Sequence, residues 1–129
     1  MDWRITEDRP IWMQLSEQIA ARITSGVYGP GERLPSVREL AAEAGVNPNT
    51  MQRAFAELES RGLVTTNRTA GRSVTQDMER IRAMRAGQAF EEAQQFLGRM
   101  RSMGFTRQEI RSVLEEILKS EDGERRENG

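Results

Sequence analysis

Side chains that can pair with nucleic-acid bases gather in the short stretch Asn-Pro-Asn-Thr-Met-Gln-Arg at residues 47–53. Asparagine and glutamine can form two hydrogen bonds to adenine, and arginine two to guanine, so Asn49, Gln52 and Arg53 could read base edges. Thr50 could contact a phosphate from the first turn of a helix, where free backbone amides also favour anions. A polar face on an isolated helix is usually only solvated, so this interpretation depends on the elements around it.

Two helices with a short connection are predicted around this stretch. Ser36 and Glu39 have the spacing of a capping box, in which the serine hydroxyl accepts the amide of Glu39 and the glutamate side chain reaches back. The helix that they begin stops at Gly45, because glycine tolerates positive φ. Asn47 is then a good N-cap, and Pro48 suits the first position of a second helix that runs to about residue 61. The short connection around a glycine is the spacing of a helix-turn-helix.

A β-hairpin is predicted directly after the second helix. The β-prone runs 63–66 and 73–75 flank a polar loop in which Arg68 and Arg72 stand on either side of Gly71. A hairpin in this position is the wing of a winged helix, and the glycine would permit close approach to a phosphate or a minor groove. Arginine is attracted to the negative potential of a narrow minor groove. An ordinary solvated hairpin loop is the alternative.

Arg38 lies in the first turn of the first helix of this pair, which crosses the DNA backbone when a helix-turn-helix docks. It could hold a phosphate or reach a base edge, or it could be solvated beside Glu39 and Glu43. Ser36 is chiefly a cap and could also contact a phosphate. The candidate DNA-binding residues are therefore Ser36, Arg38, Asn47, Asn49, Thr50, Gln52, Arg53, Arg68, Gly71 and Arg72.

Composition narrows the classes of function. The 129 residues include no cysteine, which excludes disulfides and thiolate metal sites, and no histidine, the commonest general base and metal ligand. Because the chain also has only one lysine and one tyrosine, we expect no enzyme, no metal and no cofactor. No apolar run approaches the roughly 20 residues that span a bilayer, and the first residues are unlike a signal peptide. We therefore expect a cytoplasmic protein without a membrane partner.

Charge alone does not predict a nucleic-acid ligand. The formal net charge is −1, and residues 33–75 hold six arginines against four glutamates. Because a strongly basic surface is the usual mark of a DNA-binding domain, recognition has to depend on the motif. A weakly charged module should also need a second copy to bind DNA well.

Residues 76–120 are predicted to form helices that bring two copies together. Apolar residues recur at three- and four-residue steps through 78–103, and a second capping box at Thr106 and Glu109 begins a final helix. A core with a dimer interface explains this stripe more simply than a methionine-lined ligand surface. Residues 121–129 are charged and contain a glycine, so we expect a disordered tail. The residues expected at the dimer interface are Ile81, Phe90, Phe96, Leu97, Met100, Leu114 and Ile117.

The stretch Pro-Gly-Glu-Arg-Leu-Pro-Ser-Val-Arg-Glu-Leu-Ala at 30–41, followed by Asn-Pro-Asn-Thr at 47–50, closely resembles the GntR family of bacterial transcription regulators. The resemblance extends from residue 10 to about residue 75. It implies a winged helix that binds palindromic operators as a homodimer. It also implies DNA contacts from the residues that match Arg38, Asn49, Thr50, Gln52, Arg53 and the wing glycine Gly71.

The short C-terminal region resembles that of the YtrA branch of this family. Residues 76–129 are too few for the large effector domains of other branches, whereas a two-helix tail is similar to that of YtrA-type regulators. The resemblance implies a dimer held by the tail, control of neighbouring ABC transporter genes, and half-sites about one helical turn apart. A small-molecule effector could change the spacing of the two DNA-binding units, but no residue identifies it. Many relatives carry an aromatic residue where this chain has Ser73, so the wing differs in detail.

The sequence therefore predicts a mainly α-helical protein with a small β-hairpin. It comprises a winged helix-turn-helix at 1–75, a helical dimerisation region at 76–120 and a tail at 121–129. The leading hypothesis is sequence-specific operator binding by a homodimer, most simply repression by blocking polymerase. A winged helix that binds another protein, without sequence-specific DNA binding, is the alternative that the near-zero net charge leaves open. The chain is far too short for the aminotransferase-like enzymes to which some GntR-type domains are fused.

Overall fold

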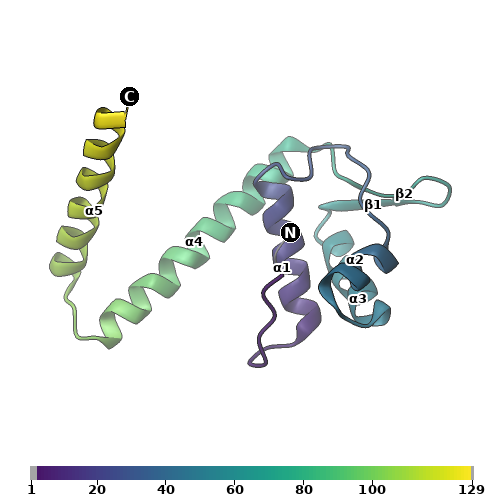
Figure 1. Ribbon diagram of the computed structural model, residues 1–129, viewed down its shortest axis with the longest axis horizontal. Helices are drawn as coiled ribbons and strands as arrows, with labels where there is room; N and C mark the ends of the chain where they lie inside the picture. The colour runs from purple at the N-terminus through teal and green to yellow at the C-terminus, as the bar shows by residue number, and fades with distance from the viewer. Residues whose placement is uncertain (1–2, 129) are drawn as a thin grey trace. The chain divides into compact units, whose positions relative to one another are not determined.

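The computed structural model describes residues 3–128, and side chains as far as residue 125. The chain forms two compact units, residues 1–87 and 88–129, and the boundary falls inside one helix. In chain order the elements are α1 (Ile11–Thr24), α2 (Val37–Ala44), α3 (Pro48–Ser60), β1 (Val64–Asn67), β2 (Gly71–Val74), α4 (Met78–Ser102) and α5 (Arg107–Asn128) (Figure 1). This mainly α-helical winged fold with a helical C-terminal region confirms the predicted fold class.

The helix α1 carries a short N-terminal segment along its side. Pro10 precedes its first turn, and the buried side chain of Gln14 donates to the backbone oxygens of Thr6 and Arg9 at 2.8 Å each. The Gln14 carboxamide oxygen in turn accepts the amide of Thr6 at 2.8 Å. The buried glutamine thus holds this segment against α1, and the hydrogen bonds satisfy polar groups that would otherwise be costly to bury.

The helix-turn-helix is fixed by local caps at both of its helices. Ser36 Oγ accepts the amide of Glu39 at 3.1 Å, and Asn47 Oδ1 accepts the amide of Asn49 at 2.8 Å, as the sequence predicts. Between them Gly45 has a φ of +70°, which lets the amide of Val46 return to the Ala41 oxygen at 2.9 Å. The two helices therefore meet at a defined angle without any long loop.

The core of the first unit lies between α1, α3 and the hairpin. Phe55, Leu58 and Met51 of α3 are each at most 1% exposed, and they pack with Leu15 and Ile19 of α1 in one continuous cluster. Because this buried stripe occupies one side of α3, the opposite side of the helix is left for solvent or a ligand.

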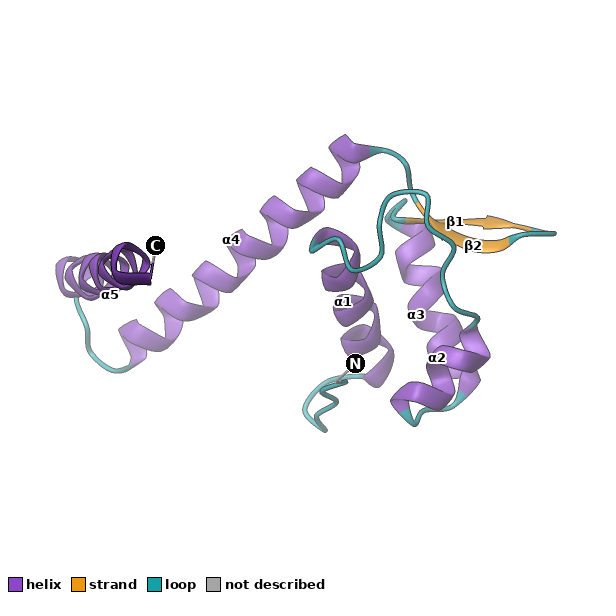
Figure 2. Ribbon diagram, turned by 45° about the horizontal axis from the view of Figure 1, so that its top comes forward, coloured by secondary structure: helices purple, strands orange, loops and turns teal. Residues whose placement is uncertain are grey.

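The wing contains the antiparallel strands β1 and β2, which lie side by side and project beyond the helices (Figure 2). A third extended segment, residues 31–34, pairs with the outer edge of β2. The Leu34 amide donates to the Arg72 oxygen at 2.8 Å, and the Val74 amide donates to the Glu32 oxygen at 2.9 Å. The hairpin is thereby tied to the chain just before α2.

The start of α4 belongs to the first unit. Ile81 is 7% exposed within the core cluster, and Met84 packs against that cluster. This placement differs from the sequence expectation, which put the domain boundary after residue 75 and put Ile81 at a dimer interface. The physical reason is that the small winged helix needs these two side chains to close its own core.

The second unit contains the rest of α4 and the whole of α5. A complete capping box begins α5. The Glu109 amide donates to Thr106 Oγ1 at 3.2 Å, and the Thr106 amide donates to Glu109 Oε1 at 3.0 Å. Helix α5 continues through Gly123 to Asn128. The sequence instead predicts a disordered tail at 121–129. Glutamate and arginine, which favour helix, outnumber the single glycine of residues 121–128. Gly129 lies outside the described residues.

The turn between α3 and β1 depends on Gly62. Its φ is +75°, and a Cβ built on it would overlap the guanidinium of Arg80, whose Nη1 donates to the Arg61 oxygen at 3.1 Å. Gly62→Ala is therefore expected to lower the free energy of unfolding by about 1–2 kcal/mol, measured by urea titration. Gly87→Ala is the matched control, because Gly87 is helical with open space around it, and it should raise stability by about 0.5–1 kcal/mol. Equal effects of the two substitutions would contradict this account of the turn.

Among the described residues, no helix is both long enough and apolar enough to cross a membrane.

Candidate nucleic-acid interface

The exposed side of α3 presents the base-reading side chains that the sequence predicts. Asn49 and Gln52 are exposed, as is the small Ala56 one turn further along. Within the described residues the side chains of Asn49 and Gln52 make no hydrogen bond, so their amide groups are available to a ligand. Thr50 is half-buried beside them. A polar, rigid helix of this kind fits the major groove of B-DNA, where each base pair shows a distinct pattern of donors and acceptors.

Arg53 lies at one edge of this surface and is held by an aromatic ring. Its guanidinium carbon is 4.4 Å from the centroid of the Trp12 ring on α1, a cation–π contact. The side chain is exposed and forms no ion pair within the described part of the chain. Its position is thus restricted while its charge stays available for a phosphate or a guanine.

The residues at the start of α2 and α3 divide into caps and free side chains. Ser36 and Asn47 use a side-chain oxygen to cap their helices, so the structure gives each a structural role first. Arg38 is exposed in the first turn of α2 and, within residues 3–125, pairs with no carboxylate. It is therefore the side chain of α2 best suited to contact a DNA strand.

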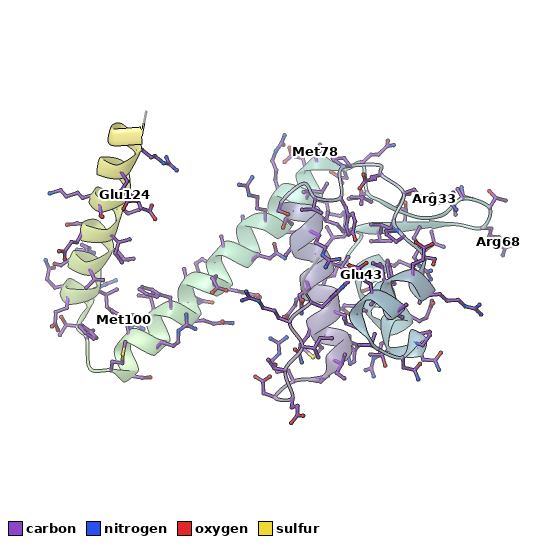
Figure 3. All side chains as sticks on the ribbon, viewed as in Figure 1. Arg33, Glu43, Arg68, Met78, Met100 and Glu124 are labelled. Atoms are coloured by element: carbon purple, nitrogen blue, oxygen red, sulfur yellow. The ribbon has the colours of Figure 1, made fainter. Side chains whose placement is uncertain are left out.

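The tip of the wing is a tight turn built on an asparagine and a glycine. Asn67 Oδ1 accepts the amides of Thr69 at 2.9 Å and Ala70 at 3.3 Å, and Gly71 has a φ of +80°. Arg68 is exposed at this tip (Figure 3). This geometry holds the tip narrow and leaves the arginine projecting from it, which suits insertion at a minor groove.

Arg72 is placed differently from the sequence expectation. Its Nε donates to Glu59 Oε1 at 2.9 Å, and its guanidinium carbon lies 5.3 Å from the ring centroid of Phe55. The side chain therefore turns inward against α3 and is already neutralised by a carboxylate. It joins the wing to α3 and is not brought together with the exposed DNA-binding candidates.

Because of the contact between the wing and α3, we expect the stability of the folded winged helix to depend on pH. Hydrogen bonds from Thr66 and then from Arg72 hold the pKa of Glu59 below its ordinary value. A lowered pKa in the folded state means that ionised Glu59 stabilises the fold above its unfolded pKa, and that this contribution disappears as the pH falls toward the lowered value.

We therefore expect Glu59→Gln to lower the Tm at neutral pH and to match the wild type increasingly as the pH is lowered into the acid range. Thermal unfolding followed over pH measures this. Glu7→Gln makes the same change of charge at an exposed residue without a partner in the described part of the chain, and it should leave the profile unchanged. A constant difference between Glu59→Gln and the wild type at every pH would contradict the assignment.

Ion pairs explain how a chain without excess charge can offer a positive surface. In the winged helix, Arg9, Arg22, Arg61 and Arg72 each lie within 4.0 Å of a carboxylate oxygen. The arginines around α2, α3 and the wing that have no such partner among the described residues are Arg33, Arg38, Arg53 and Arg68. Arg33 is not among the predicted DNA-binding residues, because nothing in its spacing separates it from an ordinary loop arginine.

The second unit exposes the apolar side chains that a dimer interface requires. Phe90 is 66% exposed, Ile117 50% and Leu114 40%, while Phe96 and Leu97 are half-buried. A groove of about 270 Å³ is lined by Leu97, Ile110, Leu114 and neighbouring side chains of α4 and α5. Met100, by contrast, is 9% exposed and packs inside the unit, so it is not at a surface that a second copy could cover. Large exposed apolar side chains of this kind are typical of an interaction site.

The fold and these side chains define a winged helix-turn-helix DNA-binding protein with a helical C-terminal extension. The family model described as bacterial regulatory proteins, gntR family, matches residues 13–74. The chain is 34% identical over 110 residues to the transcriptional regulator YhcF of Bacillus subtilis, which covers 85% of this chain and 91% of YhcF. The chain belongs to the GntR family.

Other transcriptional regulators are similar to about half of the chain or to most of it. The transcriptional repressor YtrA of Bacillus subtilis is 40% identical over 68 residues, or 53% of this chain and 52% of YtrA. A GntR family regulator from Listeria monocytogenes superposes with a TM-score of 0.79 and 34% identity, and the match covers 87% of this chain and 98% of that one. The DNA-binding domain of AraR, solved in complex with operator ORX1, gives a TM-score of 0.51 and 28% identity over 58% of this chain and 92% of that one. These relatives are transcriptional regulators and not enzymes.

Proposed function

We propose that the protein is a homodimeric repressor that binds an inverted-repeat operator, with one α3 helix in each of two successive major grooves. The observation that carries this proposal is the exposed face of α3 with Asn49, Gln52 and Arg53, next to a wing with Arg68 at its tip. Repression follows most simply if the dimer covers the site where polymerase binds. The likeness to YtrA, which is named a repressor, supports this direction of control.

The dimer is supported by both charge and surface. A single winged helix has four arginines near α3 and the wing that form no ion pair in the described part of the chain. It therefore offers few phosphate contacts, and one unit alone should bind DNA weakly. The exposed Phe90, Leu114 and Ile117 of the second unit provide an apolar face that a second copy can cover. Two linked winged helices bind the operator together, which raises the affinity for it by roughly 10²–10⁴-fold without a new contact.

The regulated genes are proposed from the resemblance to the YtrA branch. We expect the operator to lie upstream of the protein's own gene, next to genes for an ABC transporter. No side chain identifies a small-molecule effector, so regulation by such a ligand is left outside the proposal.

A mobility-shift titration tests the proposal. The full chain is titrated against the DNA upstream of its own gene and against an unrelated duplex of equal length. We expect nanomolar, salt-dependent binding to the upstream fragment, at least about 10³-fold tighter than to the unrelated one. Transcription in vitro from the same fragment should fall as the site fills. Equal affinity for the two duplexes would overturn sequence-specific recognition.

The alternative of a protein-binding winged helix makes the opposite prediction. It rests on the near-zero net charge of the chain. In that case DNA of any sequence should bind only weakly at physiological salt, and the substitution Gln52→Ala should leave DNA binding unaltered.

A further inference from the structure

Arg33 lies on the extended segment, residues 31–34, that pairs with the outer edge of β2. It pairs across this small sheet with Ser73 of β2, while the next residue, Leu34, is buried at 5% exposure in the core. Because successive side chains of a strand point to opposite faces, Arg33 is on the outer face of the wing. Its side chain is exposed and, within the described residues, forms no ion pair.

The register of β2 gives Arg33 the place that the sequence assigned to Arg72. Arg72 is one residue from Ser73, and it turns to the inner face, where Glu59 neutralises it. Arg33 instead approaches the wing glycine, since its Nε and Nη2 lie 3.8 Å from where a Cβ on Gly71 would be. Figure 3 shows Arg33 on the wing side of the unit, with Arg68 further out at the tip.

A cavity of about 450 Å³ opens at this point between the wing and the start of α2. Its lining includes Arg33, Ser36, Glu39 and Gly71, and also Arg72, whose guanidinium is paired with Glu59. A winged helix places its second helix in a major groove and its wing at the adjacent minor groove. The DNA strand that separates these grooves must then pass between α2 and the wing, where this cavity lies.

We propose that Arg33 binds a phosphate of the DNA strand that separates the two grooves, with Gly71 leaving the room for that strand to approach. The inference rests on the proposed docking of α3. A guanidinium beside a cavity large enough for a phosphate suits this role, because arginine can present two parallel donors to phosphate oxygens. The carboxylate of Glu39 lines the same cavity and opposes the phosphate.

The test compares Arg33→Ala with the wild type on the upstream fragment and on an unrelated duplex, at several salt concentrations. A lost phosphate contact lowers affinity equally for both duplexes, by about fivefold to tenfold per subunit near 0.1 M salt. It also reduces the slope of log K against log salt by about 0.9 for each subunit. Arg33→Lys should keep the slope and lose only part of the affinity.

Two matched variants complete the experiment. Arg85→Ala removes the same charge from an exposed residue of α4 and should leave the affinity and the slope unchanged. Glu39→Gln should raise affinity for both duplexes, because it removes the opposing charge while the Glu39 amide can still bond to Ser36. Circular dichroism checks that each variant is folded.

The outcomes separate this inference from the proposed function. An unchanged affinity and slope for Arg33→Ala would overturn the phosphate contact, and so would a loss of affinity confined to the upstream fragment. A wild type that does not prefer the upstream fragment would overturn the proposed function, whereas the comparison on unrelated DNA would still decide the role of Arg33.

Discussion

Replacing Ile117 by glutamate is expected to split the dimer and to lower affinity for the operator at least about 100-fold. Ile117 is 50% exposed on α5, in one apolar stripe with Leu114 and with Ile110, which is 3% exposed. In a dimer its side chain would be covered by the partner, where an unpaired carboxylate is costly. Each winged helix would then bind its half-site alone and lose the gain that linkage provides. Sedimentation equilibrium at micromolar concentration measures the dimer, and a titration of labelled operator measures the affinity.

The control introduces the same residue nearby. Lys119 is exposed on the same helix, two residues away, and Lys119→Glu should leave both the dimer and operator binding close to those of the wild type. Thermal unfolding should show that the winged helix stays folded in both variants, because the core around Phe55 lies in the other unit. If Ile117→Glu sediments as a dimer and binds the operator normally, the dimer interface lies elsewhere.

Replacing Gln52 by alanine is expected to remove most of the preference for the operator while leaving general DNA binding intact. Gln52 is exposed on α3 and has no hydrogen-bond partner for its side chain in the described part of the molecule. A bidentate contact to a base contributes roughly 1–3 kcal/mol of discrimination, so affinity should fall about tenfold to 100-fold for each half-site. Affinity for an unrelated duplex should not change, because phosphates carry no sequence information.

The matched control for Gln52 is on the same helix. Ser60→Ala alters an exposed residue near the end of α3, whose hydroxyl bonds only to the backbone oxygen of Glu57, and it should keep operator affinity within about twofold of the wild type. An equal loss on operator and unrelated DNA would assign Gln52 to a phosphate. No loss on either would mean that this side of α3 does not read DNA.

The elements of the helix-turn-helix could be predicted because their signals are local. Ser36 and Asn47 cap helices through bonds to residues two or three positions away, and Gly45 supplies the left-handed turn between them. Such bonds depend on short stretches of sequence, which is why the bounds of α2 and α3 agree with the predicted ones. The face of α3 that remains exposed follows from the apolar spacing in the same way.

The roles of the wing arginines could not be predicted, because they depend on strand register. Arg72 and Arg33 both look like loop or edge arginines in the sequence. The pairing of Val64 with Val74 places Arg72 on the inner face of the wing, against Glu59. The pairing of Arg33 with Ser73 places Arg33 on the outer face, beside Gly71. A shift of one residue would exchange these faces, and no local pattern fixes that register.

The apolar stripe of α4 shows a second limit of sequence reasoning. The apolar pattern of residues 78–103 includes Ile81 and Phe90 alike, but a sequence pattern cannot say what covers each of them. In the structure Ile81 is buried in the core of the winged helix, whereas Phe90 is 66% exposed in the second unit. Only tertiary packing separates a core residue from an interface residue along one helix.

In the proposed complex, two α3 helices that are held by one dimer occupy successive major grooves of an inverted repeat. Hydroxyl-radical footprinting on the upstream fragment, with sedimentation of the same complex, distinguishes this arrangement from a single bound winged helix. We predict two chains per duplex and two protected patches, related by a twofold axis and centred about 10–10.5 base pairs apart or a multiple of that spacing. A single protected patch with one chain bound per duplex would contradict the account.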